Sequence, residues 1–131
     1  METLTLKVRI LSLWLFVAVS MSAHGVLYVM EPGTTDELMS GEMALGPGML
    51  FFMALFSWVP LVMAFFSVTL RDNVNRRANM VLGAVFVVLN AMHLAEHFAE
   101  PSAHQILLIG STVVAPALIF WYAWKWRPAR A

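Results

Sequence analysis

The sequence predicts an all-α, polytopic membrane protein: a bundle of four transmembrane helices with a short helix in an outer loop. Hydrophobic residues make up 60% of the 131-residue chain and charged residues only 12%, and the mean hydropathy is +0.76. Four apolar segments have the roughly 20 residues that a helix needs to cross a bilayer. We therefore expect one domain over residues 1–131, with spans at about 8–30, 49–70, 80–99 and 105–124.

The charged residues are sorted along the chain. All basic residues flank one side of the predicted spans, whereas six of the eight acids and all four histidines fall on the other. The positive-inside rule then predicts a cytoplasmic-membrane protein with both termini and the loop 71–79 in the cytoplasm. The basic residues are Lys7, Arg9, Arg71, Arg76, Arg77, Lys125, Arg127 and Arg130.

Several classes of protein and partner are excluded by composition. The chain has no cysteine, which excludes thiol chemistry, thiolate metal sites and iron–sulfur clusters. Topology signals account for the basic residues, so no nucleic-acid partner is expected. The first apolar segment is longer than the core of a usual signal peptide, and we expect it to be a span. The expected partner is the lipid bilayer, with a homo-oligomer or another membrane protein left open.

The first span carries a polar stripe toward its outer end. Ser20, His24 and Tyr28 recur every four residues and therefore share one helix face, which Glu31 extends. A short helix is expected next, because residues 34–37 (Thr-Thr-Asp-Glu) fit a capping box and a glycine follows at Gly41. We expect this helix to lie over the mouth of the bundle.

The middle of the chain predicts how the spans are connected. Pro60 lies inside the second span and should kink it. The loop 71–79 is short, so the second and third spans should be antiparallel neighbours. In the fourth span, the small residues 110–112 (Gly-Ser-Thr) should permit close helix contact.

The third span ends in the most unusual stretch of the chain. His93, Glu96, His97 and Glu100 stand at i, i+3, i+4 and i+7, so a continuous helix places all four on one face, with Asn90 beside them. Ionisable groups in a membrane helix are costly and usually face a bundle interior or a cavity. This stripe is therefore the candidate functional site.

An internal similarity links this stretch to the first span. The pattern of a histidine, six residues, a glutamate and a proline begins at both His24 and His93. If the two halves of the chain are parallel repeats, these histidines are equivalent and face one cavity. Helix rise places both at about 9 Å below the outer ends of their spans. We expect them to lie at similar depth.

The residue types in this stripe suit a metal. Two imidazoles at i and i+4 can hold one ion, and His24, Glu96 or Glu100 could complete its ligands, with Tyr28 and Asn90 lining the cofactor pocket. A divalent metal, copper or haem are the candidate ligands. Two alternatives stay open: a wetted interfacial cluster, in which charged histidine beside glutamate stabilises the bundle at mildly acidic pH, and a proton-coupled or small-ligand pocket.

Further patterns bear on function. Seven methionines belong to the outer half, where thioethers would suit Cu(I), but filling of irregular apolar gaps is the favoured explanation. No nucleophile elbow, phosphate loop or Ser-His-Asp pattern is present, so an enzyme is not expected. The predicted function is a binding or accessory role; the alternatives are a proton-coupled small-molecule transporter and a purely structural membrane subunit. The methionines are Met21, Met30, Met39, Met43, Met49, Met53 and Met92.

Motifs at the loops and helix ends resemble a family of small bacterial membrane proteins of unknown function, similar in layout to DoxX-like four-helix proteins. The resemblance covers most of the chain. It implies a four-helix bundle in a bacterial cytoplasmic membrane and no assigned activity, and the stretch 93–97 matches no motif of that family. The motifs are residues 7–11 (Lys-Val-Arg-Ile-Leu), 30–33 (Met-Glu-Pro-Gly), 37–41 (Glu-Leu-Met-Ser-Gly), 47–48 (Pro-Gly), 75–79 (Asn-Arg-Arg-Ala-Asn) and 121–126 (Trp-Tyr-Ala-Trp-Lys-Trp).

Overall fold

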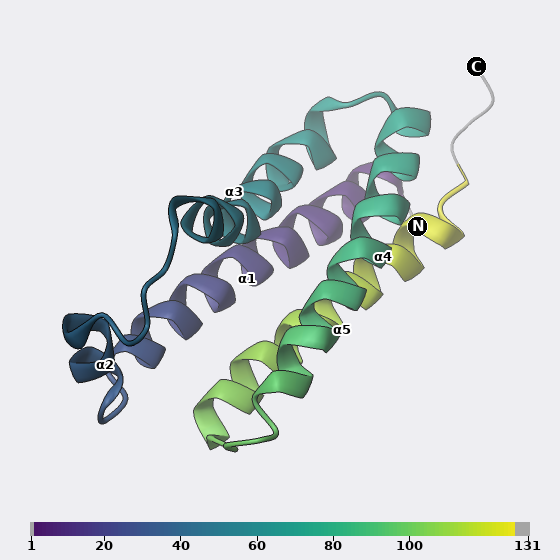
Figure 1. Cartoon of the computed structure of the whole chain (residues 1–131). Coiled ribbons are helices and arrows are strands. Elements are labelled where there is room, and N and C mark those ends of the chain that lie inside the picture. The colour runs from purple at the N-terminus through teal and green to yellow at the C-terminus, as the bar shows by residue number, and fades with distance from the viewer. Residues whose placement is uncertain (1, 128–131) are drawn as a thin grey trace.

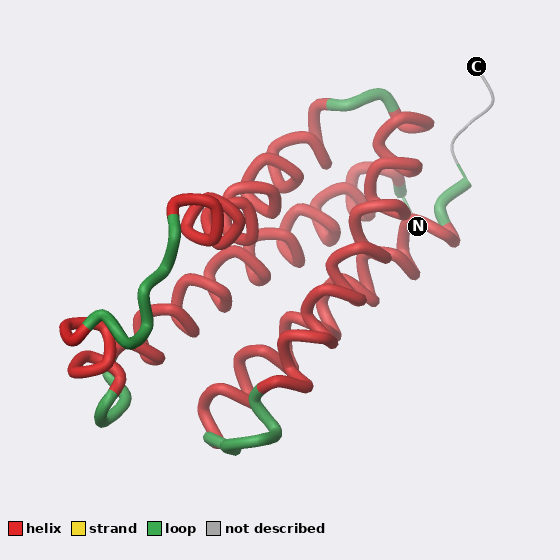
Figure 2. Tube along the Cα trace, in the orientation of Figure 1, coloured by secondary structure: helices red, strands yellow, loops and turns green. Residues whose placement is uncertain are grey.

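The computed structural model describes residues 2–127, and within them the chain is helical with short connections (Figures 1 and 2). Four of its five helices are long and apolar enough to cross a membrane. The predicted all-α bundle of four spans is confirmed, while the sequence-predicted topology signal at Arg130 lies outside the described residues. The helices are α1 (Thr3–Val29), α2 (Thr34–Ser40), α3 (Pro47–Thr69), α4 (Asp72–Glu96) and α5 (Ala103–Lys125).

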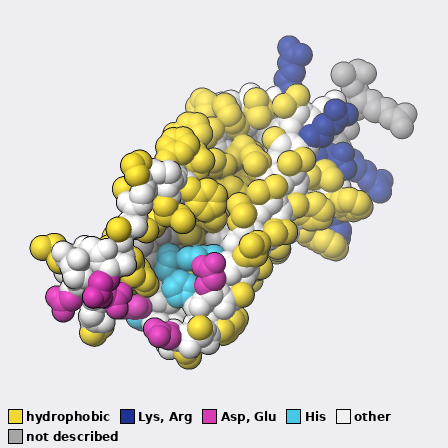
Figure 3. Space-filling model, viewed as in Figure 1, with side chains coloured by type: hydrophobic (Ala, Val, Ile, Leu, Met, Phe, Trp, Pro, Cys, Tyr) yellow, Lys and Arg dark blue, Asp and Glu magenta, His cyan; other side chains and the backbone are white. Residues whose placement is uncertain are grey.

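The two ends of the bundle differ in charge. The described chain, residues 2–127, begins and ends at the same end of the bundle, where Lys and Arg side chains also gather (Figures 1 and 3). Most of the acidic side chains and the His side chains gather at the opposite end, whereas Asp72 pairs with Lys7 at the basic one (Figure 3). We call these the basic end and the histidine end. The sorting of charge seen in the sequence is thus a property of the folded molecule.

The order of the helices around the bundle differs from the predicted one. α1 packs extensively on both α3 and α5, and α4 packs on α5, but α3 has little contact with α4. Near their connecting loop the Asn75 side-chain amide donates to the Ser67 carbonyl at 2.7 Å. Toward the middle of the helices, Phe56 meets Phe86 with ring centroids 5.8 Å apart. Figure 1 shows them diverging from that loop. The expectation of antiparallel neighbours along their length is therefore wrong.

α4 and α5 approach each other closely at Gly83. A side-chain carbon at Gly83 would lie 3.1 Å from the backbone nitrogen of Phe120 and 3.2 Å from the carbonyl of Pro116, so a larger residue there would force the two helices slightly apart. Of the small residues 110–112 that were predicted to permit close contact, Thr112 is buried and meets Asn90 of α4 at 3.2 Å. An added carbon at Gly110 meets nothing within 4 Å, so the glycine at the closest approach is Gly83 of α4.

The buried face of α4 is largely polar. Its buried positions follow one another at intervals of three or four, which is the spacing of a helix seam, and the same spacing continues to His93. In an apolar core these groups need internal partners. The indole Nε1 of Trp14, for example, donates to the side-chain oxygen Oδ1 of Asn79 at 2.6 Å. The buried residues of α4 are Asn75, Asn79, Gly83, Phe86 and Asn90.

Two helix boundaries correct the sequence prediction. α4 begins at Asp72, so residues 72–79 are its first turns and not a loop. The Arg76 side chain there donates to the Ala123 carbonyl at 3.1 Å, which ties the start of α4 to the end of α5. α4 ends at Glu96 with His97 as its cap residue, so the predicted helix to residue 99 is too long.

The loop helix α2 forms, but not as predicted. Its N-cap residue is Gly33, with no side-chain capping bond, so the capping box is absent. Gly41 ends the helix at φ 78°, as expected for a left-handed C-cap. Among the long helices α2 contacts α1, and it lies beside the mouth of the bundle (Figure 1). The histidine end is therefore left open.

The second span forms α3 with Pro60 inside it, fully buried. The ribbon of α3 bends along its length in Figure 1, in agreement with the predicted kink.

Candidate metal centre

Three of the predicted site residues converge at the histidine end. His24 projects from the last turns of α1 and is buried, at 8% exposure. His93 projects from the last turn of α4, and His97 caps that helix; both are half-buried. Figure 3 shows the histidine side chains in a hollow flanked by acidic side chains.

The three imidazoles form a nearly regular triangle. Ring centroids lie 5.0 Å apart for His24 and His93, 5.2 Å for His24 and His97, and 5.0 Å for His93 and His97. The rings stand nearly perpendicular to one another, at 74° to 85°. One ligand nitrogen from each lies within 4.8 Å of the other two. We call these three residues the histidine triad.

His24 and His93 are in direct contact, with their Nε2 atoms 3.0 Å apart. The prediction that these two histidines face one cavity at similar depth is confirmed. The repeat that motivated it is not kept in the packing, because α5 lies along α1 whereas the corresponding helix α3 barely touches α4. That difference leaves the side of α4 toward α3 open.

The predicted carboxylates take different positions. The Glu96 carboxylate is 3.5 Å from Nδ1 of His93, with its side chain 76% exposed. Glu100 is exposed in the turn after α4, so the expectation that it continues the helical stripe is wrong. The helix ends earlier because the Phe98 backbone bonds back to the Ala95 carbonyl in a turn, shortly before Pro101. Of the two, only Glu96 lies beside the triad.

Tyr28 and Asn90, predicted to line the cofactor pocket, differ in their surroundings. The Tyr28 ring stands 6.2 Å from His24 and 6.3 Å from His97 between centroids, with its hydroxyl directed to Met43 Sδ at 4.0 Å. The Asn90 amide donates to the Phe86 carbonyl at 2.8 Å and accepts from the Thr112 hydroxyl at 3.2 Å. Tyr28 therefore flanks the triad, whereas Asn90 is occupied in joining α4 to α5.

A chain of hydrogen bonds lies behind His24. Nδ1 of His24 bonds Oε1 of Gln105, a fully buried residue in the first turn of α5. The Gln105 amide donates to the Glu31 carboxylate at 3.0 Å. His104 Nε2 lies 2.9 Å from the same carboxylate oxygen. The chain thus runs from the buried imidazole to an exposed histidine.

Sequence reasoning missed Gln105, although a signal was present. Buried positions of α5 follow one another at intervals of three or four, and Gln105 is the first of them. Ile109 and Thr112 lie on the buried face of α5, and the same helical spacing continued toward the start of the helix reaches Gln105. The residue was passed over because it stands at the edge of the apolar run.

Two groups beyond the helices that cross the membrane have shifted pKa values. The pKa of Glu31 is lowered, chiefly by the hydrogen bond from Gln105, with a contribution from His104. The pKa of His97 is lowered, first by desolvation and then by the neighbouring His93. Desolvation outweighs Glu96 and Glu31, which act in the opposite direction. The carboxylates thus favour the charged form of His97, as expected, but the net shift of its pKa is in the other direction.

The methionines of the histidine end do not gather at the triad. Met21 packs against the hydrophobic core, and Met30, Met39 and Met49 are exposed. Met53 and Met92 are exposed as well, and Met43 accepts from the Tyr28 hydroxyl beside the triad. The arrangement agrees with apolar filling and lipid contact for most of them.

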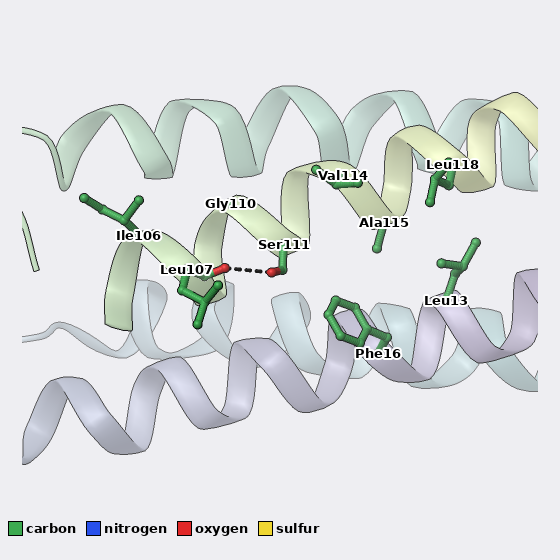
Figure 4. Close-up of a pocket in the computed structure, with 9 residues that line it drawn as sticks. All are labelled: Leu13, Phe16, Ile106, Leu107, Gly110, Ser111, Val114, Ala115 and Leu118. Atoms are coloured by element: carbon green, nitrogen blue, oxygen red, sulfur yellow. Dashed lines mark hydrogen bonds between the residues drawn. The ribbon is translucent and has the colours of Figure 1, made fainter. Parts of the chain in front are cut away.

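A second hollow lies away from the histidines. It is an apolar groove of about 610 Å³ between α1 and α5 (Figure 4). Its one hydroxyl, on Ser111, donates to the Leu107 carbonyl at 2.7 Å and is thereby satisfied. In a bilayer such a surface meets acyl chains. The lining residues are Leu13, Phe16, Ile106, Leu107, Gly110, Ser111, Val114, Ala115 and Leu118.

Comparison of the sequence and fold with protein-family models, curated proteins and solved structures finds no match. The function is therefore argued from the geometry of the site.

Proposed function

We propose that this membrane protein binds one divalent transition-metal ion at the histidine triad. The observation that supports this most directly is the convergence of three ligand nitrogens within 4.8 Å. Imidazole is a favoured ligand of Zn²⁺, Cu²⁺ and Ni²⁺. Tetrahedral bonds of 2.0–2.1 Å to Zn²⁺ place neighbouring nitrogens roughly 3.3 Å apart. The 3.0 Å between His24 and His93 is close to that spacing, and side-chain rotation would have to bring His97 to it from within 4.8 Å.

Three protein ligands leave one coordination position of a tetrahedral ion for water or another small ligand. The triad lies in a hollow at the surface (Figure 3), so that position faces the open side. Acidic side chains around the hollow favour the approach of cations. A role in capturing or holding metal fits this arrangement.

A metal ion is preferred over haem because of the contact within the triad. A porphyrin ring separates the two imidazoles that bind its iron from opposite faces, but His24 and His93 are in hydrogen-bonding contact. The third imidazole also converges on the same point. The geometry suits a single ion held from one side.

Metal binding is likewise preferred over proton-coupled transport. A proton pathway across a membrane usually runs along ionisable residues. Residues 10–23, 47–69, 78–92 and 105–124 contain no Asp, Glu, His, Lys or Arg. The ionisable groups at the histidine end thus have no counterpart deeper in the four helices.

The proposal includes the place of the site in the cell. The charge sorting predicts that the histidine end faces outward from a cytoplasmic membrane, and the resemblance to small four-helix bacterial proteins agrees with that location. The metal is then taken from the outer aqueous side.

Equilibrium metal binding tests the proposed function. Tag-free protein in lipid nanodiscs is titrated with Zn²⁺, Co²⁺ and Cu²⁺, and bound metal is counted by elemental analysis. We expect one ion per chain, with the visible absorption of tetrahedral Co²⁺. The variant H24A/H93A/H97A should bind none, while the control N73A, at an exposed position of the basic end, should bind as the parent does. Equal binding by the triple variant, or a lack of stoichiometric binding by the parent, would overturn the proposal.

A further inference from the structure

Gln105 is the polar residue most deeply buried beside the triad, and both ends of its side-chain amide are engaged. Its amide nitrogen donates to Oε1 of Glu31 at 3.0 Å, and its oxygen bonds Nδ1 of His24. Residue 105 is fully buried in the first turn of α5. A buried amide in an apolar bundle is costly without partners, and these two contacts supply them.

The direction of each bond fixes the next one. A carboxylate only accepts hydrogen bonds, so the NH₂ group of Gln105 must face Glu31. The amide oxygen is then the atom that faces His24. Because an amide oxygen also only accepts, Nδ1 of His24 must carry the hydrogen. In the neutral imidazole this leaves the lone pair on Nε2.

The ring nitrogen of His24 that keeps its lone pair, Nε2, is the one that faces the other two histidines of the triad. Nε2 of His24 lies 3.0 Å from Nε2 of His93, on the side of the ring away from Gln105. Glu31, the origin of this chain, is held by His104 at 2.9 Å as well as by Gln105. The direction of every hydrogen bond in this series is therefore set by the Glu31 carboxylate near the surface and passed inward to His24.

We infer that Gln105 is a positioning residue, which holds His24 in the Nδ1–H tautomer so that its Nε2 lone pair points into the triad, and that Glu31 sets the orientation of the Gln105 amide. Where this concerns metal affinity it rests on the proposed function. Histidine ligands commonly donate their second ring nitrogen to such a partner, and loss of the partner weakens metal binding by about 10- to 100-fold.

Nitrogen NMR of ¹⁵N-histidine-labelled, metal-free protein at alkaline pH tests the tautomer directly. We expect His24 to be protonated at Nδ1 in the parent. Q105L removes the acceptor and should give a mixture of tautomers. The matched control is T112V, which removes a buried polar group two turns further along α5 that contacts Asn90 and not His24. Retention of the parent tautomer by Q105L would overturn the inference.

A paired exchange tests the same point in a bundle that keeps its polar groups. The double variant Q105E/E31Q retains one carboxylate and one amide but exchanges their positions. The carboxylate at position 105 then accepts the hydrogen bond from Nδ1 of His24, and the amide at position 31 donates to that carboxylate. His24 should keep Nδ1–H. A mixed tautomer there, despite an intact acceptor, would also overturn the inference.

Metal titration of the same proteins separates this inference from the proposed function. Q105L should lower affinity for Zn²⁺ by about 10- to 100-fold, and Q105E/E31Q should restore it. Metal affinity of Q105L equal to that of the parent would overturn the positioning role. If the parent binds no metal, the proposed function fails, while the tautomer experiment still decides the role of Gln105.

Discussion

His24 and His93 are separated by 69 positions in the chain, yet their Nε2 atoms lie 3.0 Å apart. Each stands near the histidine end of a helix, α1 or α4, and His97 joins them from the cap of α4. Unlike the exposed His104, these three imidazoles share one hollow. Their chemical properties should therefore depend on one another, and the following predictions use that dependence and the packing that produces it.

Each member of the triad should contribute to metal affinity. H24A, H93A and H97A each remove one metal ligand. Loss of a residue that only hydrogen-bonds a ligand weakens metal binding by up to about 100-fold, so each of these variants should weaken Zn²⁺ binding by at least that factor. E96Q should have a smaller effect, because Glu96 lies 3.5 Å from the other ring nitrogen of His93 and is largely exposed. Competition titration against a chelator of known affinity measures these differences. A loss for E96Q as large as that for H93A would contradict the assignment of ligands.

Acidification should destabilise the metal-free bundle. Because the pKa of His97 is lowered in the folded state by desolvation and by His93, the unfolded chain binds more protons once the pH falls below about 6.5, the ordinary histidine pKa. The stability contributed by neutral His97 is present above that pH and is lost progressively as the pH falls toward the lower, folded-state pKa.

Thermal unfolding in detergent tests this loss of stability. The unfolding temperature is measured from mildly acidic to mildly alkaline pH in the presence of a chelator. H97A should show a weaker dependence on pH than the parent. With metal bound, acidification should also release the ion, because protons compete for the same nitrogens. A parent protein that becomes more stable on acidification would favour the imidazolium–carboxylate pairing that the sequence had suggested.

Gly83 and Gly110 should respond oppositely to the same substitution. G83A forces a carbon to within 3.1 Å of the Phe120 backbone, and overpacking of this kind costs about 1–3 kcal/mol. G110A meets nothing within 4 Å, so its effect should be neutral or slightly stabilising. Unfolding of both variants in one detergent compares them directly. Equal destabilisation would show that α5 also uses its Gly110 face for packing, as in contact with a second copy.

Single cysteines should report the orientation of the bundle. The chain has no natural cysteine, so S40C and A99C at the histidine end and N73C at the basic end each introduce a unique thiol. All three positions are exposed, whereas the nearby Asn75 is fully buried and unsuitable. By the positive-inside rule an impermeant reagent added to intact cells should label the first two and not the third. Labelling of N73C alone would invert the orientation.

The sequence by itself determined the features that depend on local composition and period. Apolar length located four spans, and Gly41 marked the end of α2. The depth of His24 and His93 followed from helix rise, because rise per residue is a local property of any helix. Helix boundaries were less accurate: residues 72–79 look like a polar loop, but Asn75 and Arg76 find partners on neighbouring helices that make the extra turns stable.

Only the tertiary structure decided which helices are neighbours and which side chains meet. α4 packs closely on α5, with Gly83 at the point of closest approach, and has little contact with α3, an arrangement that the short connecting loop does not reveal. The packing of α5 on α1 places Gln105 between His24 and Glu31, and the early end of α4 leaves Glu100 exposed beyond it. Contacts between helices depend on the shapes of two surfaces at once, so the period of either helix alone does not specify them.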